Sequence, residues 1–427
     1  MYRDIIPIAM LNVLQKLPKN PNSDHFAFEI GYDKGNKKIS EIFRVRHLGS
    51  RAKWFDSIKT LWYHFKKNEP MPKISKNTIA FVDDNIGLVQ ELKKNNHINK
   101  VSINDFHIQE VLGYGAFSSV FLVTHKETKQ KYAMKVMDKN ILIEQKHLHY
   151  IITEFEILKQ VNNFPFILSL HYAFQTANYL FMVTDYCSQG DITKIKRIKN
   201  QKVLLAELIL AFEFLHSKNI IYRDLKPENI LLSEDGHIKL CDFNLAKENI
   251  DDNTRAMSFC GSPMYLSPEM LGQDGVKKSA DIYGIGLIIY EIIVGKPAFY
   301  TTNPQLLYNN IASNNINFNH PRIETQEEKD LLKRILMLQP EMRLSISDMK
   351  RHPYFKEIDW DKVMKKELGR IEIEKRQEQR AKRIPERAHN ITKAEIIKDD
   401  KREMKNCVRN FFYIRQNELN LNRMNSN

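Results

Sequence analysis

Hydrophobic and polar positions divide the 427-residue chain into zones with different periodicities. In the first hundred residues, short alternating runs (DIIPIAML, HFAFEIGY and SEIFRVRHL) predict strands, and SRAKWFDSIKTLWYHFKK at 50–67 has the three- and four-residue spacing of a helix. From 106 to about 200, strand patterns surround one helical pattern, and after 200 the pattern is mostly helical. We therefore expect an α+β fold in which a small β-rich lobe precedes a larger helical lobe, with a cleft between them.

Composition refines these zones into four segments. We predict an N-terminal region at 1–67, an Asn- and Lys-rich linker at 68–105, a folded unit at 106–355, and a basic tail at 356–427 that is partly helical or disordered. The longest apolar stretch, IYGIGLIIYEIIV, contains Glu291 and predicts a buried helix rather than a membrane span. Four scattered cysteines without a CxxC pair favour a reducing, cytoplasmic setting over a zinc or disulfide scaffold.

The net charge of +13 is concentrated at the two ends of the chain. Residues 1–105 hold 18 Lys and Arg against 11 Asp and Glu, residues 356–427 hold 19 against 13, and the middle holds 28 of each. Such basic flanks suit an acidic membrane surface, which would make the protein peripherally membrane-associated. Ordinary solvated, lysine-rich surface is the alternative. We expect no nucleic acid partner.

Two features of the β-rich zone suggest a phosphate site. In LGYGAFSSV at 112–120, Gly113 and Gly115 let backbone amides approach a phosphate closely, although a plain hairpin also accommodates GxG. A strand follows, which argues against a dinucleotide-binding fingerprint. Lys135 lies in the apolar strand YAMKVM, where a charge is costly unless it is paired. Glu154 is the candidate partner, and a purely structural ion pair is the alternative.

A more specific pattern follows in the helical zone. The segment IYRDLKPENILL at 221–232 places Asp224, Lys226 and Asn229 on a loop between apolar runs. About ten residues later, IKLCDFNLAKE delivers Asp242 at the end of a second strand. Carboxylate and amide oxygens on neighbouring loops are suitable ligands for a magnesium ion.

Taken together, these motifs resemble the motif set of the protein kinase family. They occur in the same order: the glycine loop, the strand lysine, the helix glutamate, YRDLKPEN, DFN, and SPE at 267–269. The resemblance covers about 106–355. It is closest to the AGC group of serine/threonine kinases, to which YRD, SFCGSPMYLSPEML at 258–271 and FKEIDWDKVMKKEL at 355–368 are similar. It implies a bilobal protein kinase fold with a small antiparallel β-sheet lobe, ATP and Mg²⁺ as cofactors, and phosphate transfer to Ser or Thr of protein substrates.

The resemblance also implies a role for each residue of the site. Asp224 would accept the proton of the substrate hydroxyl, and Lys226 would steady the γ-phosphate. Lys135, held by Glu154, would contact the α- and β-phosphates, while the Mg²⁺ ligands would be Asn229 and Asp242. The residues expected around the nucleotide are Leu112, Gly113, Gly115, Ser118, Val120, Ala133, Lys135, Thr184, Asp185, Cys187, Asp191 and Leu231.

Substrate choice and regulation follow from the same resemblance. Asp191, Glu228 and Glu291 match acidic groups that face substrate arginines in basophilic relatives, which predicts a preference for Arg N-terminal to the target residue. Ser258 matches the activation-loop phosphosite, which an upstream kinase would modify and Arg223 would bind; a plain loop serine is the alternative. Arg343 matches the structural partner of Glu269.

The sequence differs from the family pattern at several positions. Ser118 replaces the third loop glycine, and the connection after Asp191 is short for the group. Asn244 replaces the glycine of DFG; because Asn tolerates left-handed backbone, we expect a cost of about 1 kcal/mol or less, retained activity in Asn244→Gly, and a local side-chain bond.

Neither end of the chain matches the group fully. The Phe-x-x-Phe-Ser/Thr motif of the group is not evident in the tail, where NFFYIRQ at 410–416 is a poor match, so we expect no docking of the tail onto the small lobe. Residues 1–67 resemble the last part of a pleckstrin-homology domain, with Trp54 on its helix, but lack the opening strands that normally bind phosphoinositides.

Overall fold

A computed structural model of the chain describes residues 11–16, 26–34, 37–45, 101–115, 117–250, 256, 261–272, 275–375, 391–399, 408 and 411–415. The chain divides into two compact units, Met1–Asn99 and Lys100–Asn427.

The described part of the first unit is an antiparallel sheet. Its strands are β1 (Leu11–Lys16), β2 (Phe26–Lys34) and β3 (Lys37–Val45), in the order β1-β2-β3. Strands β2 and β3 pair along their whole described length, from Phe26 and Val45 to Lys34 and Lys37. The second and third alternating runs of the sequence therefore form strands as predicted. The helix predicted at 50–67, with Trp54, lies outside the described residues, so the resemblance to a pleckstrin-homology domain stays a prediction.

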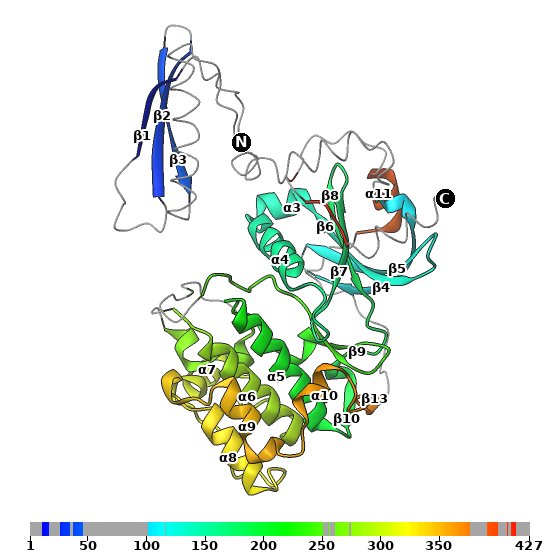
Figure 1. The fold of residues 1–427 in the computed structure, drawn as a ribbon, viewed down its shortest axis with the longest axis vertical. Helices are drawn as coiled ribbons and strands as arrows, with labels where there is room; N and C mark the ends of the chain where they lie inside the picture. The colour runs from blue at the N-terminus through cyan, green and yellow to red at the C-terminus, as the bar shows by residue number, and fades with distance from the viewer. Residues whose placement is uncertain are drawn as a thin grey trace. The chain divides into compact units, whose positions relative to one another are not determined.

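The second unit begins with a lobe built on a six-stranded antiparallel sheet in the order β14-β7-β8-β6-β5-β4 (Figure 1). Its strands are β4 (Phe106–Tyr114), β5 (Ser118–His125), β6 (Lys131–Asp138), β7 (Leu170–Gln175), β8 (Tyr179–Asp185) and β14 (Tyr413–Ile414). Two helices, α3 (Lys139–Glu144) and α4 (Leu148–Val161), connect β6 to β7. The central strand β8 is buried along almost its whole length, which explains its continuous apolar sequence YLFMV.

The second lobe is mainly helical, as predicted. Its helices are α5 (Gln201–Ser217), α6 (Ser279–Val294), α7 (Pro304–Ala312), α8 (Gln326–Ile335), α9 (Ile346–Arg351) and α10 (Trp360–Met364). Helix α6 is buried on nearly every side, in agreement with its apolar sequence. A Cβ atom at Gly286 would lie 2.6 Å from Ile335 on α8, so this glycine permits the close packing of the two helices.

Small β elements complete the second lobe next to the junction with the first. Strands β9 (Gly190–Asp191), β11 (Ile230–Leu232) and β12 (Ile238–Leu240) form a sheet in the order β12-β11-β9. The short connection after Asp191 contains no α-helix between residues 192 and 200. Instead β10 (Ile195–Ile198) pairs with β13 (Ile373–Lys375) from the tail.

The described residues of the tail beyond 390 lie on the small lobe, which corrects the expectation that the tail does not dock. We call residues 391–399, 408 and 411–415 the C-terminal strap. It contains helix α11 (Lys393–Asp399) and strand β14, which pairs with β7 at the edge of the sheet. Phe411 is 2% exposed, and its ring lies 4.7 Å from that of Phe155 on α4. The poor match to the family motif therefore still supplies a buried aromatic anchor.

Candidate active site

The loop that carries Asp224 is anchored to the buried helix α6. The backbone N–H groups of Tyr222 and Arg223 donate to the two carboxylate oxygens of Asp281, at 2.9 and 2.8 Å. Arg223 has a left-handed φ of 67°, a conformation that a non-glycine residue keeps only where its surroundings hold it. Sequence reasoning missed Asp281, although an acid within an otherwise apolar helix pattern is the signal that could have revealed it.

Asp224 lies at the centre of a compact polar cluster. Its side chain accepts hydrogen bonds from Lys226 Nζ at 2.6 Å and from Ser262 Oγ at 2.8 Å. Lys226 also donates to Ser262, at 3.0 Å. The carboxylate is thus oriented by a cation and a hydroxyl, and Ser262 is a further residue that the motifs did not single out. A base held this way can receive a proton from a hydroxyl placed beside it.

The two predicted metal ligands lie on loops that are hydrogen-bonded to each other. The backbone N–H of Cys241, next to Asp242, donates to the carbonyl of Asn229 at 3.0 Å. The Asn229 side-chain amide donates to the Asp224 carbonyl at 2.8 Å, which connects the two predicted metal ligands to the predicted base.

The type of donor group fits a magnesium ion. Asp242 and Asn229 offer hard oxygen donors, and a Mg²⁺ bound by one or two side chains and by substrate phosphates is the usual arrangement at a nucleotide site. Within the described part of the chain, no group of three or more His, Cys, Asp or Glu side chains is arranged to hold a metal ion.

The lysine of β6 and the glutamate of α4 form the predicted ion pair. Lys135 Nζ lies 2.7 Å from Glu154 Oε2, and the two side chains are 19% and 5% exposed. Burial opposes the charge of the lysine, but the negative charges of Glu154 and Asp242 outweigh it and raise the pKa of Lys135. The lysine therefore stays cationic and is available to a phosphate. The ion pair also fixes α4 against the sheet.

The residues predicted around the nucleotide lie on neighbouring strands. In sheet order they are Leu112 and Gly113 on β4, Ser118 and Val120 on β5, Ala133 and Lys135 on β6, and Thr184 and Asp185 on β8, with Asp191 and Leu231 paired on β9 and β11. The glycine loop closes through a 2.7 Å bond from the Gly115 N–H to the Ser118 carbonyl. A Cβ atom at Gly115 would lie 2.6 Å from Ser118 Oγ, so a larger residue at this position would require the Ser118 side chain to move.

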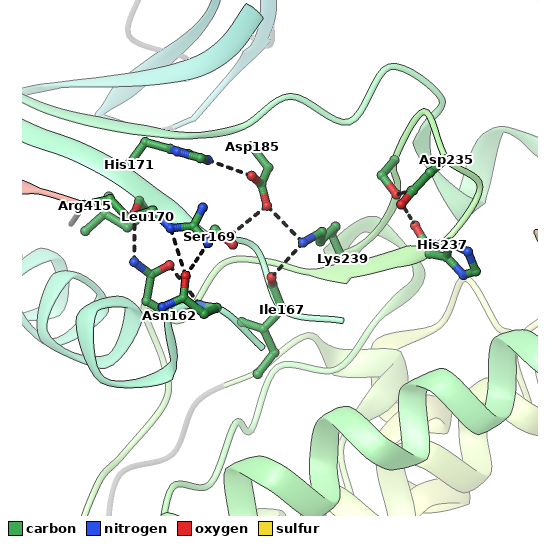
Figure 2. Close-up of polar contacts among 12 residues, drawn as sticks. Asn162, Ile167, Ser169, Leu170, His171, Asp185, Asp235, His237, Lys239 and Arg415 are labelled. Atoms are coloured by element: carbon green, nitrogen blue, oxygen red, sulfur yellow. Dashed lines mark hydrogen bonds and ion pairs between the residues drawn. The ribbon is translucent and has the colours of Figure 1, made fainter. Parts of the chain in front are cut away.

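Asp185, at the end of β8, directs its carboxylate into a network at the junction of the lobes. The carboxylate accepts from His171 Nε2 at 2.8 Å and from the Ser169 N–H at 3.0 Å, and Lys239 Nζ lies 3.1 Å away (Figure 2). Burial alone would raise the pKa of Asp185, but these donors and the lysine charge hold the pKa well below its usual value. The side chain of Asp185 therefore holds the junction of the lobes together, and the backbone N–H of Asp185 also donates to the Ser169 carbonyl, at 3.1 Å.

Two other predicted residues have restricted chemistry. Burial raises the pKa of the Cys187 thiol to about 12, so this residue behaves as a small, protonated side chain. The carboxylate of Asp191 accepts from the Thr193 N–H at 3.1 Å and lies 3.3 Å from Lys194 Nζ. Asp191 thus caps the turn that follows it, and part of its charge is already neutralised.

A cleft of about 680 Å³ borders the catalytic loop on the side of α7. Its lining includes Lys226, Glu228, Ser262 and Tyr265. Glu228 is exposed, while Glu291 accepts a 2.8 Å hydrogen bond from the Tyr265 hydroxyl. The predicted pair of Arg343 and Glu269 is confirmed as a buried bidentate contact with distances of 2.6 and 2.7 Å. Ser258 lies outside the described residues.

Comparison with known proteins agrees with this geometry. Residues 106–355 match the family described as protein kinase domain, and the chain belongs to this family. It is 37% identical over 277 residues to a RAC family serine/threonine-protein kinase homolog of Dictyostelium discoideum, covering 63% of this chain and 62% of the relative. It is 39% identical over 280 residues to the serine/threonine-protein kinase sck2 of Schizosaccharomyces pombe, covering 62% and 43%.

A third relative, the RAC-beta serine/threonine-protein kinase of Mus musculus, is 32% identical over 344 residues, covering 77% of this chain and 70% of the relative. The chain spans less than two thirds of the length of the first two relatives. These relatives confirm the resemblance to the AGC group and the serine/threonine class of the domain. Within the described residues, no helix has both the length and the apolar character needed to cross a membrane.

Proposed function

We propose that this chain is an active, ATP- and Mg²⁺-dependent serine/threonine protein kinase. One observation carries the proposal: the Lys135–Glu154 ion pair is formed at 2.7 Å while Asp224, Lys226, Asn229 and Asp242 all retain the side chains that phosphate transfer requires. A kinase fold that serves only as a scaffold is the rival function. The complete set of catalytic side chains argues against it.

The chemistry follows from the positions of these groups. Asp224 would receive the proton of a substrate hydroxyl, while Lys226 beside it would balance charge on the transferred phosphate. Lys135 would hold the α- and β-phosphates. Asn229 and Asp242 would hold Mg²⁺, which, when bound, neutralises charge on the phosphates. Because the transferred group is already highly charged, positioning and charge neutralisation supply most of the rate enhancement.

The experiment is transfer of the γ-phosphate from ATP to peptides that contain Ser or Thr, comparing the wild type with Asp224→Asn. The variant is expected to lose about 10²- to 10⁴-fold in rate, as for removal of a general base. Its thermal unfolding should resemble that of the wild type, because asparagine has almost the same size. Absence of transfer by both proteins would favour the scaffold.

We further propose that the enzyme prefers Arg N-terminal to the target residue. The exposed Glu228 borders the cleft beside Lys226, where a substrate guanidinium could reach it. Glu291, bound to Tyr265, adds a second acid from α6. The partial neutralisation of Asp191 by Lys194 restricts the contribution of the third acid. Equal phosphorylation of peptides with and without arginine would refute this preference.

Two proposals concern regulation and location. An upstream kinase would phosphorylate Ser258, and Arg223, which precedes the catalytic base, would bind the added phosphate. Full activity of Ser258→Ala would contradict this switch. The basic flanks would bring the enzyme from the cytoplasm to an acidic membrane surface. Vesicle flotation of the full chain, with and without anionic lipid, tests that association.

A further inference from the structure

The residue after Phe243 places its side chain on the metal-binding carboxylate. Asn244 Nδ2 donates to Asp242 Oδ1 at 2.6 Å, which confirms the local bond expected from the sequence. The backbone argument for this asparagine was wrong, however. The left-handed φ of this segment belongs to Asp242, at 57°, and Asn244 does not have a positive φ. What distinguishes Asn244 from glycine here is therefore its side chain rather than its backbone freedom.

The other end of the same amide is unsatisfied. Asn244 Oδ1 is buried and has no hydrogen-bond partner among the described residues. A buried acceptor without a partner costs about 1–3 kcal/mol. Carboxamide oxygens are hard ligands that suit Mg²⁺ and Mn²⁺. The side chain of Asn244 also contacts a metal-binding carboxylate. A cation bound there would satisfy the oxygen and explain why it is buried without a protein partner.

We infer that Asn244 belongs to the metal centre, where Nδ2 restrains Asp242 and Oδ1 serves as an additional oxygen ligand for the cation. This inference rests on the proposed function, since it assumes that Asp242 binds the metal. The bond from Asn244 does not exhaust Asp242, because a carboxylate has two oxygens with about four acceptor positions. Asn244 therefore raises metal affinity beyond what Asp242 and Asn229 supply.

The test measures metal binding directly. The full-length protein is loaded with a non-hydrolysable ATP analogue, and binding of Mn²⁺ is followed by the loss of the free-ion electron paramagnetic resonance signal. Asn244→Ala, which lacks both the donor and the oxygen, is expected to bind Mn²⁺ about tenfold more weakly. Asn244→Asp keeps an oxygen at the same position and is expected to bind at least as tightly as the wild type.

Two control variants separate the possible failures. Asp242→Asn should lose most Mn²⁺ binding; if it does not, the metal site of the proposed function is wrong. Asn309→Ala, on the exposed face of α7, should bind as the wild type does. If Asp242→Asn loses binding while Asn244→Ala binds as tightly as the wild type, the inference about Asn244 is overturned. Binding in Asn244→Asp that is no tighter than in Asn244→Ala would overturn the ligand role, because both variants lack the donor and only Asn244→Asp keeps the oxygen.

Discussion

The catalytic cleft and the C-terminal strap reach their positions by different means. In the cleft, Asp224, Lys226 and Asn229 lie within six residues, and Asp242 follows soon after. In the strap, the contacts join parts of the chain that are far apart: Thr176 Oγ1 donates to Asp399 across 223 positions, and Gln175 bonds to Val408 across 233. The main residues of the cleft are thus close together in the sequence, whereas the position of the strap depends on the folded small lobe.

The strap also uses less distinctive groups. Both backbone groups of Val408 bond to the side-chain amide of Gln175, at 2.7 and 2.8 Å, and β14 adds to the sheet through its backbone. Backbone groups occur in every sequence, so this docking needs no recognisable motif. Two side chains of the strap add specific anchors. Asp399 accepts a hydrogen bond from Thr176 Oγ1, and Phe411 packs on Phe155, the residue next to Glu154. The two regions therefore meet at α4.

The largest expected effect comes from removing the aromatic anchor Phe411. Phe411→Ala should weaken the strap by about 3 kcal/mol, because it deletes a buried aromatic ring, and should lower phosphate transfer by loosening α4 and the Lys135–Glu154 pair. The rate of transfer and the proteolytic sensitivity of the tail are the measurements. Phe412→Ala is the matched control, since this neighbouring ring is 37% exposed. Equal behaviour of the two variants would show that the strap does not support the cleft.

The next effect tests the junction network in Figure 2. Lys239→Met removes the cation that lies 3.1 Å from Asp185 and 3.4 Å from the Ile167 carbonyl. We expect the KM for ATP to rise about fivefold, equivalent to about 1 kcal/mol, with kcat little changed, because the strand that carries Asp185 also carries Thr184, and both residues are proposed to border the nucleotide. Steady-state kinetics with varied ATP is the measurement. Lys239→Arg, which keeps the charge, should behave nearly as the wild type; an unchanged KM in Lys239→Met would rule out a role for the network in nucleotide binding.

A smaller effect concerns substrate choice at the edge of the cleft. Lys194→Ala should free Asp191 and raise selectivity for arginine-containing peptides about two- to fivefold, as expected for a partly exposed ion pair worth below about 1 kcal/mol. The ratio of kcat/KM for matched peptides with and without arginine measures this effect. Arg197→Ala removes a nearby exposed charge of the same sign and serves as the control. If both variants shift the ratio equally, general charge explains selectivity and Asp191 does not.

The smallest expected effect lies where the tail contacts the large lobe. Burial acts against the charge of Asp235, but hydrogen bonds from Lys366 and Ser233 lower its pKa to about 2. A lowered carboxylate pKa adds stability above the unfolded value near 3.8, and this stability is lost as the pH falls from about 4 to 2. Lys366→Met should therefore reduce the loss of unfolding free energy between pH 5 and pH 3. The reduction should be only a few tenths of a kcal/mol, because the Lys366–Asp235 pair is partly exposed. Urea unfolding at the two pH values measures it, and an unchanged difference would contradict the assignment.

Much of the fold and the site could be predicted from local patterns. The alternating runs of the small lobe, the buried helix α6 and the loop residues Asp224, Lys226 and Asn229 are visible in the sequence, because period and spacing determine them. The anchors of these loops were not visible. Asp281 lies more than fifty residues from Arg223, whose N–H it binds, and Ser262 reaches Asp224 from another loop.

The amino-acid sequence by itself determined which chemical groups the site contains and in which order they occur, since short loops bring these groups together in any folded form of the motif. Only the tertiary structure decided what those groups contact. It placed Ser262 on Asp224, turned Asp185 toward Lys239, and laid the strap on the small lobe. The physical reason is that the direction of a side chain and the addition of a strand to a sheet depend on partners from distant segments. The local periodicity of the sequence does not indicate which segments those are.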